Sequence, residues 1–285
     1  MALLRRLSVE VPERVEEINH KLKQRVFLFR SPWRDYVQLI LLIAAILWLG
    51  SISVRRLGYY WQWHQVPRYL FRFEGGQLVI GPLIEGLLFT LQISAISLVL
   101  AMALGLATAL MRLSGSFTGR LLSRIYLEVI RNTPLLVQIY ISYFVLGPIF
   151  GLRRFGSAVL ALTLFSGSYA SEVFRSGIVS IHKGQWEAAH SLGLSTFDTY
   201  RDVILPQAIR RIVPPLTSQA ISLVKGSALV STVSLMDLTM QARLIASQTY
   251  MVFEIWFTVA AIYLVVTVPL STITDYLEKR FSIVT

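Results

Sequence analysis

The side chains best suited to bind a small polar molecule are charged and hydroxyl groups inside otherwise apolar runs. Lys225 lies near the middle of such a run. The same helical face carries Ser218, Ser222 and Thr232, which form a polar stripe. A charge at the centre of a bilayer costs about 3 kcal/mol or more unless it is paired or hydrated. Lys225 therefore indicates either contact with a transported solute or a buried ion pair.

Glu172, near the end of another apolar run, is a carboxylate that can form such a pair, although Arg175 is an alternative partner three residues away. Beside Lys225, Gly226 and Ser227 loosen the helix, and backbone groups freed there can bind a carboxylate or an ammonium group. The candidate residues of a solute pathway are Glu172, Ser222, Lys225, Ser227 and Thr232.

No catalytic or metal-binding pattern stands out in the sequence. The histidines, His20, His64, His182 and His190, lack the spacing of metal ligands. The phosphate-binding pattern G-x-x-x-x-G-K-[ST] is absent, so the chain cannot bind ATP through a P-loop. We expect a protein that is not an enzyme and carries no metal or cofactor of its own.

Composition predicts an integral membrane protein. Of the 285 residues, 54% are hydrophobic and only 15% are charged, and the mean hydropathy is +0.60. The net charge of +11 comes from basic residues that flank the apolar runs, which argues against nucleic-acid binding. The expected fold is all-α, with membrane-spanning helices in a lipid bilayer.

Six apolar runs are long enough to cross the hydrocarbon core. They cover residues 36–54, 86–111, 133–150, 157–174, 212–235 and 255–273. The second run has small residues at Ala101, Gly105 and Ala109, a spacing that lets another helix approach closely, and Ser94 and Ser97 extend that face. Between the first two runs, residues 55–81 contain interfacial Tyr and Trp side chains and are expected to lie on the membrane surface.

The distribution of Lys and Arg predicts the orientation. With both termini inside, 19 of the 27 basic residues lie on the inner side and 7 on the outer side. Positive charge is enriched in cytoplasmic loops, so we expect cytoplasmic N- and C-termini. The polar segment 185–211 between the fourth and fifth runs is then also cytoplasmic.

Segment 185–211 is predicted to form a helix, a turn and a second helix. Gly193 follows the helix-favouring run Glu187-Ala188-Ala189 and can adopt the positive φ that closes a helix. Ser195 and Asp198 have the spacing of a capping box, so a new helix is expected near Thr196. Its apolar stripe, suited to burial in a partner, comprises Phe197, Tyr200, Val203 and Ile204. Pro206 is expected to end or turn it.

An amphipathic segment of this kind can simply lie on the lipid surface. However, Glu187-Ala188-Ala189, followed by Gly193 and then Leu205-Pro206, resembles the EAA loop of permease subunits of ATP-binding-cassette (ABC) importers. The resemblance implies that 185–211 docks into a cleft on a separate ATPase and transmits its closure to the membrane helices. The coupling residues that it implies are Glu187, Ala188, Ala189, Gly193, Leu205 and Pro206.

The resemblance extends over about residues 85–280. Residues 86–91, 131–138, 168–175 and 183–185 are similar to motifs of the polar amino-acid branch of these permeases. The similarity implies a five-helix core of the type I ABC importer fold, preceded by one additional N-terminal helix. Residues 1–80 would then form a cytoplasmic segment, the extra helix and an outer loop, and residues 81–285 the permease domain.

The implied function is import of a polar amino acid across a bacterial cytoplasmic (inner) membrane. The implied partners are a second permease subunit, identical or homologous, a cytoplasmic ATPase dimer that holds ATP and Mg²⁺, and an extracytoplasmic solute-binding protein. A membrane anchor or signalling partner that uses 185–211 to bind a cytoplasmic protein is the alternative. The polar stripe around Lys225 argues against it, since an anchor has no need of one. A secondary transporter is a third possibility, but it should show inverted repeats or a chain of carboxylates in the spans, and the sequence shows neither.

Overall fold

The computed structural model describes residues 32–56 and 58–281, and the chain separates into two compact units, Met1–Trp61 and Gln62–Thr285. In the first unit, the predicted first span lies within helix α2 (Pro32–Arg56). The stretch of α2 that qualifies as apolar, Asp35–Ile46, is shorter than a membrane span. A helix is therefore present where the sequence predicts it, but the structure does not confirm six spans.

The second unit begins with short elements that the sequence did not predict. These are η1 (Trp63–Gln65), α3 (Pro67–Leu70) and an antiparallel hairpin of β1 (Phe71–Glu74) and β2 (Gln77–Ile80). Gly75 and Gly76 both have positive φ and close the hairpin. The fold is therefore mostly helical rather than all-α in the described residues.

These short elements belong with the membrane helices. Val66, Tyr69 and Leu70 pack into a cluster with α12 (Leu238–Thr249) and α13 (Val252–Phe281), and the backbone N–H of Gln62 donates to Glu254 at 2.6 Å. These contacts place the division between units at residues 61 and 62, earlier than the domain boundary expected at residues 80 and 81.

Three helices are long and apolar enough to cross a membrane: α4 (Pro82–Leu113), α8 (Arg154–Val179) and α13. They correspond to the predicted second, fourth and sixth runs. Two bent pairs of helices bring the total in the described residues to as many as five spans, if each pair is counted as one span. One pair joins α5 (Phe117–Arg131) to residues 135–150 at 108°, and the other joins residues 196–233 to α12 at 51°.

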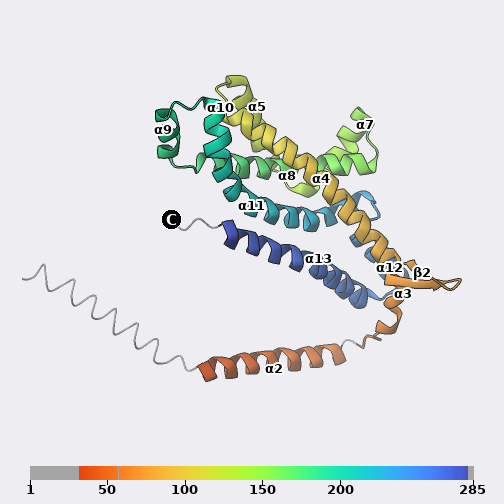
Figure 1. Ribbon diagram of the computed structural model, residues 1–285. Helices are drawn as coiled ribbons and strands as arrows, with labels where there is room; N and C mark the ends of the chain where they lie inside the picture. The colour runs from red at the N-terminus through yellow and green to blue at the C-terminus, as the bar shows by residue number, and fades with distance from the viewer. Residues whose placement is uncertain (1–31, 57, 282–285) are drawn as a thin grey trace, which may run out of the picture. The chain divides into compact units, whose positions relative to one another are not determined.

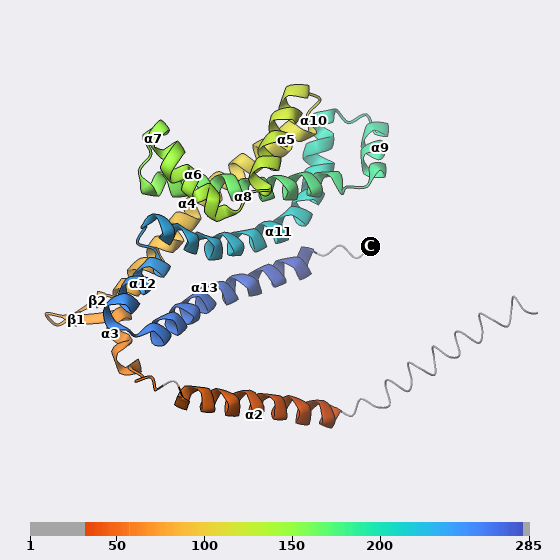
Figure 2. The same cartoon turned by 180° about the vertical axis from the view of Figure 1, so that it is seen from behind.

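The predicted third and fifth spans are interrupted. Residues 133–150 divide into α6 (Leu135–Ile141), the π-helical turn η2 (Ser142–Leu146) and α7 (Gly147–Phe150), with Pro134 as the residue before α6. All but the last two of residues 212–235 lie in α11 (Leu205–Gly226) and the 3₁₀ segment η4 (Ser227–Val233). Figures 1 and 2 show α11 between α8 and α13, both of which it contacts.

Close packing of α4 on α8 follows from the small residues that the sequence singled out. Ala101 and Ala109 are fully buried, as is Ser97, and a Cβ added at Gly105 would lie 2.6 Å from the Cβ of Ala170 on α8. The absence of a side chain at Gly105 thus allows the two backbones to approach. The predicted contact face is confirmed.

Candidate coupling loop and solute groove

A glycine turn joins the two parts of segment 185–211. Helix α9 (Lys183–Ser191) ends in a Schellman motif, in which Leu194 N–H donates to Ala189 C=O at 3.1 Å and Gly193 N–H to His190 C=O at 3.0 Å. Gly193 has φ +74°, a region that most side chains disfavour. The positive φ predicted for Gly193 is confirmed.

The next helix starts where the sequence predicts. Ser195 is the N-cap of α10 (Thr196–Asp198), and its Oγ accepts from the backbone N–H of Asp198 at 3.1 Å. In a capping box the side chain three residues on usually accepts from the backbone N–H of the cap residue. Here the Asp198 carboxylate accepts instead from the Ser195 hydroxyl, at 2.5 Å. The cap therefore ties the serine and the aspartate directly to each other.

Pro206 neither ends nor turns this helix, contrary to the prediction. The π-helical segment η3 (Thr199–Ile204) follows α10 and runs directly into α11, and Pro206 lies in the first turn of α11. Pro206 has no backbone N–H to donate, so the helical backbone passes through this position without a hydrogen bond from it. The loop is consequently continuous with α11, which allows a displacement of the loop to reach the membrane helices.

Most of the predicted apolar stripe packs within the chain itself rather than remaining free for a partner. Ile204 is fully buried, and Tyr200 and Val203 pack in a cluster between α8, α9 and α11. Tyr200 also contacts Trp186 edge to face, with ring centroids 5.0 Å apart. The loop is thus fixed to the membrane helices by its own core.

The apolar side chains that remain exposed lie on the two sides of the Gly193 turn. Leu192 is 81% exposed and Phe197 is 71% exposed. Of the implied coupling residues, Ala189 is buried, and Glu187, Ala188, Gly193, Leu205 and Pro206 are exposed. The sequence reading missed Leu192, although a leucine next to a glycine turn in a polar loop is a signal for an exposed contact. The loop therefore presents apolar, acidic and backbone groups together.

A groove of about 490 Å³ lies between α8 and α11. Two of the predicted pathway residues, Glu172 and Ser222, line the groove, and so does Ser218 of the polar stripe. Gln219, which the sequence reading missed, lines it as well; its Nε2 donates to Ser166 C=O, while its buried Oε1 has no hydrogen-bond partner among the described residues. The groove thus offers polar groups on apolar walls.

The remaining predicted pathway residues lie beyond the groove lining. Lys225 is exposed, and none of the ion pairs of the described residues involves it. Ser227 is buried and donates to Val224 C=O at 2.8 Å, while Thr232 donates to Leu229 C=O at 2.7 Å. The loosening expected beside Lys225 is present, because α11 gives way to 3₁₀ geometry at Ser227.

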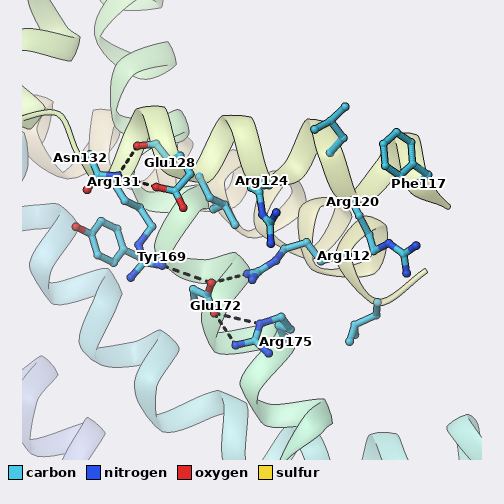
Figure 3. Close-up of a pocket in the computed structure, with 13 residues that line it drawn as sticks. Arg112, Phe117, Arg120, Arg124, Glu128, Arg131, Asn132, Tyr169, Glu172 and Arg175 are labelled. Carbon is cyan, nitrogen blue, oxygen red and sulfur yellow. Dashed lines mark hydrogen bonds and ion pairs between the residues drawn. The ribbon is translucent and has the colours of Figure 1, made fainter. Parts of the chain in front are cut away.

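Glu172 pairs with arginines rather than with Lys225. Arg112 donates to its Oε1, Arg131 lies 3.4 Å from the same oxygen, and Arg175 lies 3.0 Å from its Oε2 (Figure 3). The local pair with Arg175 is confirmed, and Arg112 and Arg131 connect α8 to α4 and α5. The alternative in which Glu172 neutralises Lys225 is not the arrangement in the structure.

Comparison with known proteins identifies relatives of this chain. Residues 100–283 match the family model of the binding-protein-dependent transport system inner membrane component. The probable glutamine ABC transporter permease protein GlnM of Bacillus subtilis (strain 168) is 42% identical over 198 residues, which cover 69% of this chain and 91% of that protein. The glutamine transport system permease protein GlnP of Escherichia coli (strain K12) is 39% identical over 204 residues, which cover 70% of this chain and 93% of that protein.

Solved structures share the fold. A crystal structure of an amino acid ABC transporter with histidines superimposes with a TM-score of 0.66 at 40% identity, over 70% of this chain and 94% of that chain. The MetNI methionine ABC transporter in an inward-facing conformation gives a TM-score of 0.61 at 20% identity, over 71% of this chain and 97% of that chain. The second likeness shows the fold alone.

Proposed function

This chain belongs to the family of binding-protein-dependent transport system inner membrane components, and from that premise we propose that it forms one half of the path of a polar amino acid across a bacterial inner membrane. It is a permease subunit of an amino-acid ABC importer. The names of the two relatives support glutamine, or an amino acid of similar size and polarity, as the solute.

The partners follow from this role. A second permease, identical or homologous, completes the path, a solute-binding protein delivers the amino acid from outside, and a cytoplasmic ATPase dimer holds ATP and Mg²⁺. The excess of Lys and Arg on one side supports cytoplasmic termini and a cytoplasmic 185–211 loop. Six spans, with α2 as the first, remain part of this proposal.

The observation that carries the proposal is the rigid loop that presents exposed apolar side chains. Leu192 and Phe197 flank a turn that is fixed by the Schellman motif and by the Ser195 cap. Large apolar side chains on a stiff protrusion suit insertion into a pocket of a partner. We assign them to contact with the ATPase, together with Glu187, Ala188, Gly193, Leu205 and Pro206.

The solute pathway is assigned to the groove between α8 and α11, where Glu172, Ser222 and Gln219 lie. The other predicted pathway residues come after the groove residues of α11 in the sequence, around the change from α to 3₁₀ geometry; they are Lys225, Ser227 and Thr232. A helix break that leaves backbone groups available beside polar side chains is a common form of transporter site.

Retention of the cognate ATPase by the purified permease tests the loop assignment. The variant Leu192→Ser/Phe197→Ser should bind the ATPase about tenfold more weakly for each side chain removed, since buried anchors at an interface are worth roughly that factor. As a control, Ile149→Ser/Phe150→Ser changes two side chains that are 68% and 65% exposed at α7 and should bind normally. Equal retention by the loop variant and wild type would exclude the assignment.

A further inference from the structure

A pocket of about 850 Å³ lies where the end of α4, helix α5 and the last part of α8 meet (Figure 3). Its size is in the range of small-ligand sites. Five arginines line it: Arg112, Arg120, Arg124, Arg131 and Arg175. The carboxylates in the lining are Glu128 and Glu172, so the pocket carries an excess of three positive charges.

The two carboxylates leave part of this positive charge available. Glu172 is shared by Arg112, Arg131 and Arg175, and Glu128 accepts from the side chain of Asn132 at 3.0 Å. Arg120 and Arg124 are exposed and have no carboxylate partner among the described residues.

The arginines of α5 share one orientation. Figure 3 shows Arg120, Arg124 and Arg131 projecting from the same side of the helix, the side on which Arg112 and Glu172 lie. Guanidinium groups that converge without enough carboxylates suit a phosphate, which several N–H groups can bind at once.

The opposite side of α5 indicates which phosphate-bearing molecule fits. Leu122, Ile125 and Val129 recur at helical spacing and are 55%, 53% and 57% exposed. A helix with a basic face and an exposed apolar face is typical of segments at the lipid interface. The apolar face therefore places α5 at the membrane surface, where the phosphates at hand are those of lipid headgroups.

We propose that this pocket binds the phosphate of an anionic phospholipid, with Arg120 and Arg124 as its principal contacts, while the opposite, apolar face of α5 lies against the surrounding bilayer. Basic pockets between helices at the cytoplasmic side of a membrane bind such headgroups. This inference rests on the orientation given under the proposed function, which places the turn between α4 and α5 on that side. The lipid would then bind on α5, beside the place where Glu172 connects α4, α5 and α8.

Native mass spectrometry of the intact transporter, titrated with phosphatidylglycerol or phosphatidylcholine, tests the proposal. Arg120→Gln/Arg124→Gln should bind phosphatidylglycerol roughly 30-fold more weakly, about fivefold for each arginine, and bind phosphatidylcholine as wild type does. Arg120→Lys/Arg124→Lys keeps the charges and should retain most of the affinity.

Two further measurements are controls. One tests whether loss of positive charge elsewhere has the same effect, and the other tests whether the bound phosphate belongs to a lipid or to a soluble molecule. Arg153→Gln/Arg154→Gln removes the same charge from exposed positions at the other end of α8 and should leave lipid binding unchanged. Glycerol 1-phosphate, added as a soluble competitor, should not displace the lipid at equal concentration, because it lacks the acyl chains.

The proposal is wrong if Arg120→Gln/Arg124→Gln binds phosphatidylglycerol as wild type does. It is also wrong if Arg153→Gln/Arg154→Gln loses phosphatidylglycerol to the same extent as Arg120→Gln/Arg124→Gln. Displacement by glycerol 1-phosphate at equal concentration would overturn the lipid assignment in favour of a soluble phosphate. The readout is bound lipid mass, so it does not depend on ATPase binding or solute uptake. Failure of the coupling assignment is therefore distinguishable from failure of the lipid site.

Discussion

Glu172 connects three helices of the permease through ion pairs. Its carboxylate contacts arginines from α4, α5 and its own helix α8, and its side chain is 26% exposed. Removing the negative charge leaves three guanidinium groups facing one another in a partly buried place. The residue therefore contributes to stability whether or not it also contacts solute.

Glu172→Gln should lower the free energy of unfolding by about 1–3 kcal/mol, because an amide cannot neutralise the arginines. The measurement is the midpoint of thermal unfolding of the purified permease. Glu128→Gln is the matched control, since Glu128 is exposed and its carboxylate accepts one hydrogen bond from Asn132. If the two variants unfold at the same temperature, Glu172 does not hold the three helices together.

Gly193 permits a test of backbone conformation without a steric clash. No atom lies within 4 Å of a Cβ built there, so the penalty of a substitution comes from φ +74° alone. Gly193→Val should cost about 1–3 kcal/mol and reduce ATPase retention. Gly193→Asn should retain the ATPase, because asparagine tolerates a left-handed backbone.

Gly115 provides the control for added bulk in an exposed turn. A Cβ there also meets no atom within 4 Å, and its φ is outside the left-handed range. Gly115→Val should therefore behave like wild type in the same retention assay. Normal coupling by Gly193→Val would show that the turn geometry is irrelevant to docking.

Local signals explain which parts of the loop the sequence predicted. The positive φ of Gly193 and the cap at Ser195 depend on residues within a few positions and were both correct. Burial of Tyr200 and Ile204 depends on α8 and α11, which no local pattern reveals. The arginine partners of Glu172 lie 60 and 41 residues away, so spacing alone suggested only Arg175.

At the scale of the elements, α4 packs closely on α8, and Gly105 lies at their contact. A Cβ there would lie 2.6 Å from Ala170 Cβ and 3.0 Å from Gly167 C=O. Gly105→Leu should force the helices apart and cost about 1–3 kcal/mol or more. Lower thermal stability and lower yield of inserted protein are the expected observations.

Gly156→Leu on α8 is the comparison, because a Cβ at Gly156 meets only the Leu152 side chain, at 3.5 Å or more. That variant should insert and unfold nearly as wild type does. A Gly105→Leu protein as stable as the Gly156→Leu protein would mean that α4 and α8 can separate freely.

Helices with continuous apolar runs were predictable, whereas most of their interruptions were not. The length of their apolar runs predicted α4, α8 and α13. Gly226 and Ser227 indicated the loosening at η4, but the π turn η2 and helix α12 leave no such pattern. For α12 the signal was Asp237, whose carboxylate accepts from the backbone N–H groups of Thr239 and Met240 at 3.2 and 3.1 Å.

At the scale of the whole molecule, the division at residues 61 and 62 predicts that the first unit is dispensable for coupling. A chain that begins with Met followed by Gln62 keeps the backbone N–H that donates to Glu254. It should retain the ATPase and solute-stimulated turnover once inserted, although insertion itself should fall because orienting charges are lost. A correctly inserted truncated protein that binds the ATPase without solute-stimulated turnover would show that residues 1–61 take part in transport.

We propose that this chain couples a solute path to a separate ATPase through the 185–211 loop. The most direct test is ATPase turnover in proteoliposomes that contain this permease, its partner subunits and a glutamine-loaded binding protein. Turnover should rise when the loaded binding protein is added to wild type, and the rise should disappear in Leu192→Ser/Phe197→Ser while Ile149→Ser/Phe150→Ser keeps it. Full stimulation of the Leu192→Ser/Phe197→Ser transporter would show that these loop side chains do not couple the ATPase to the solute path.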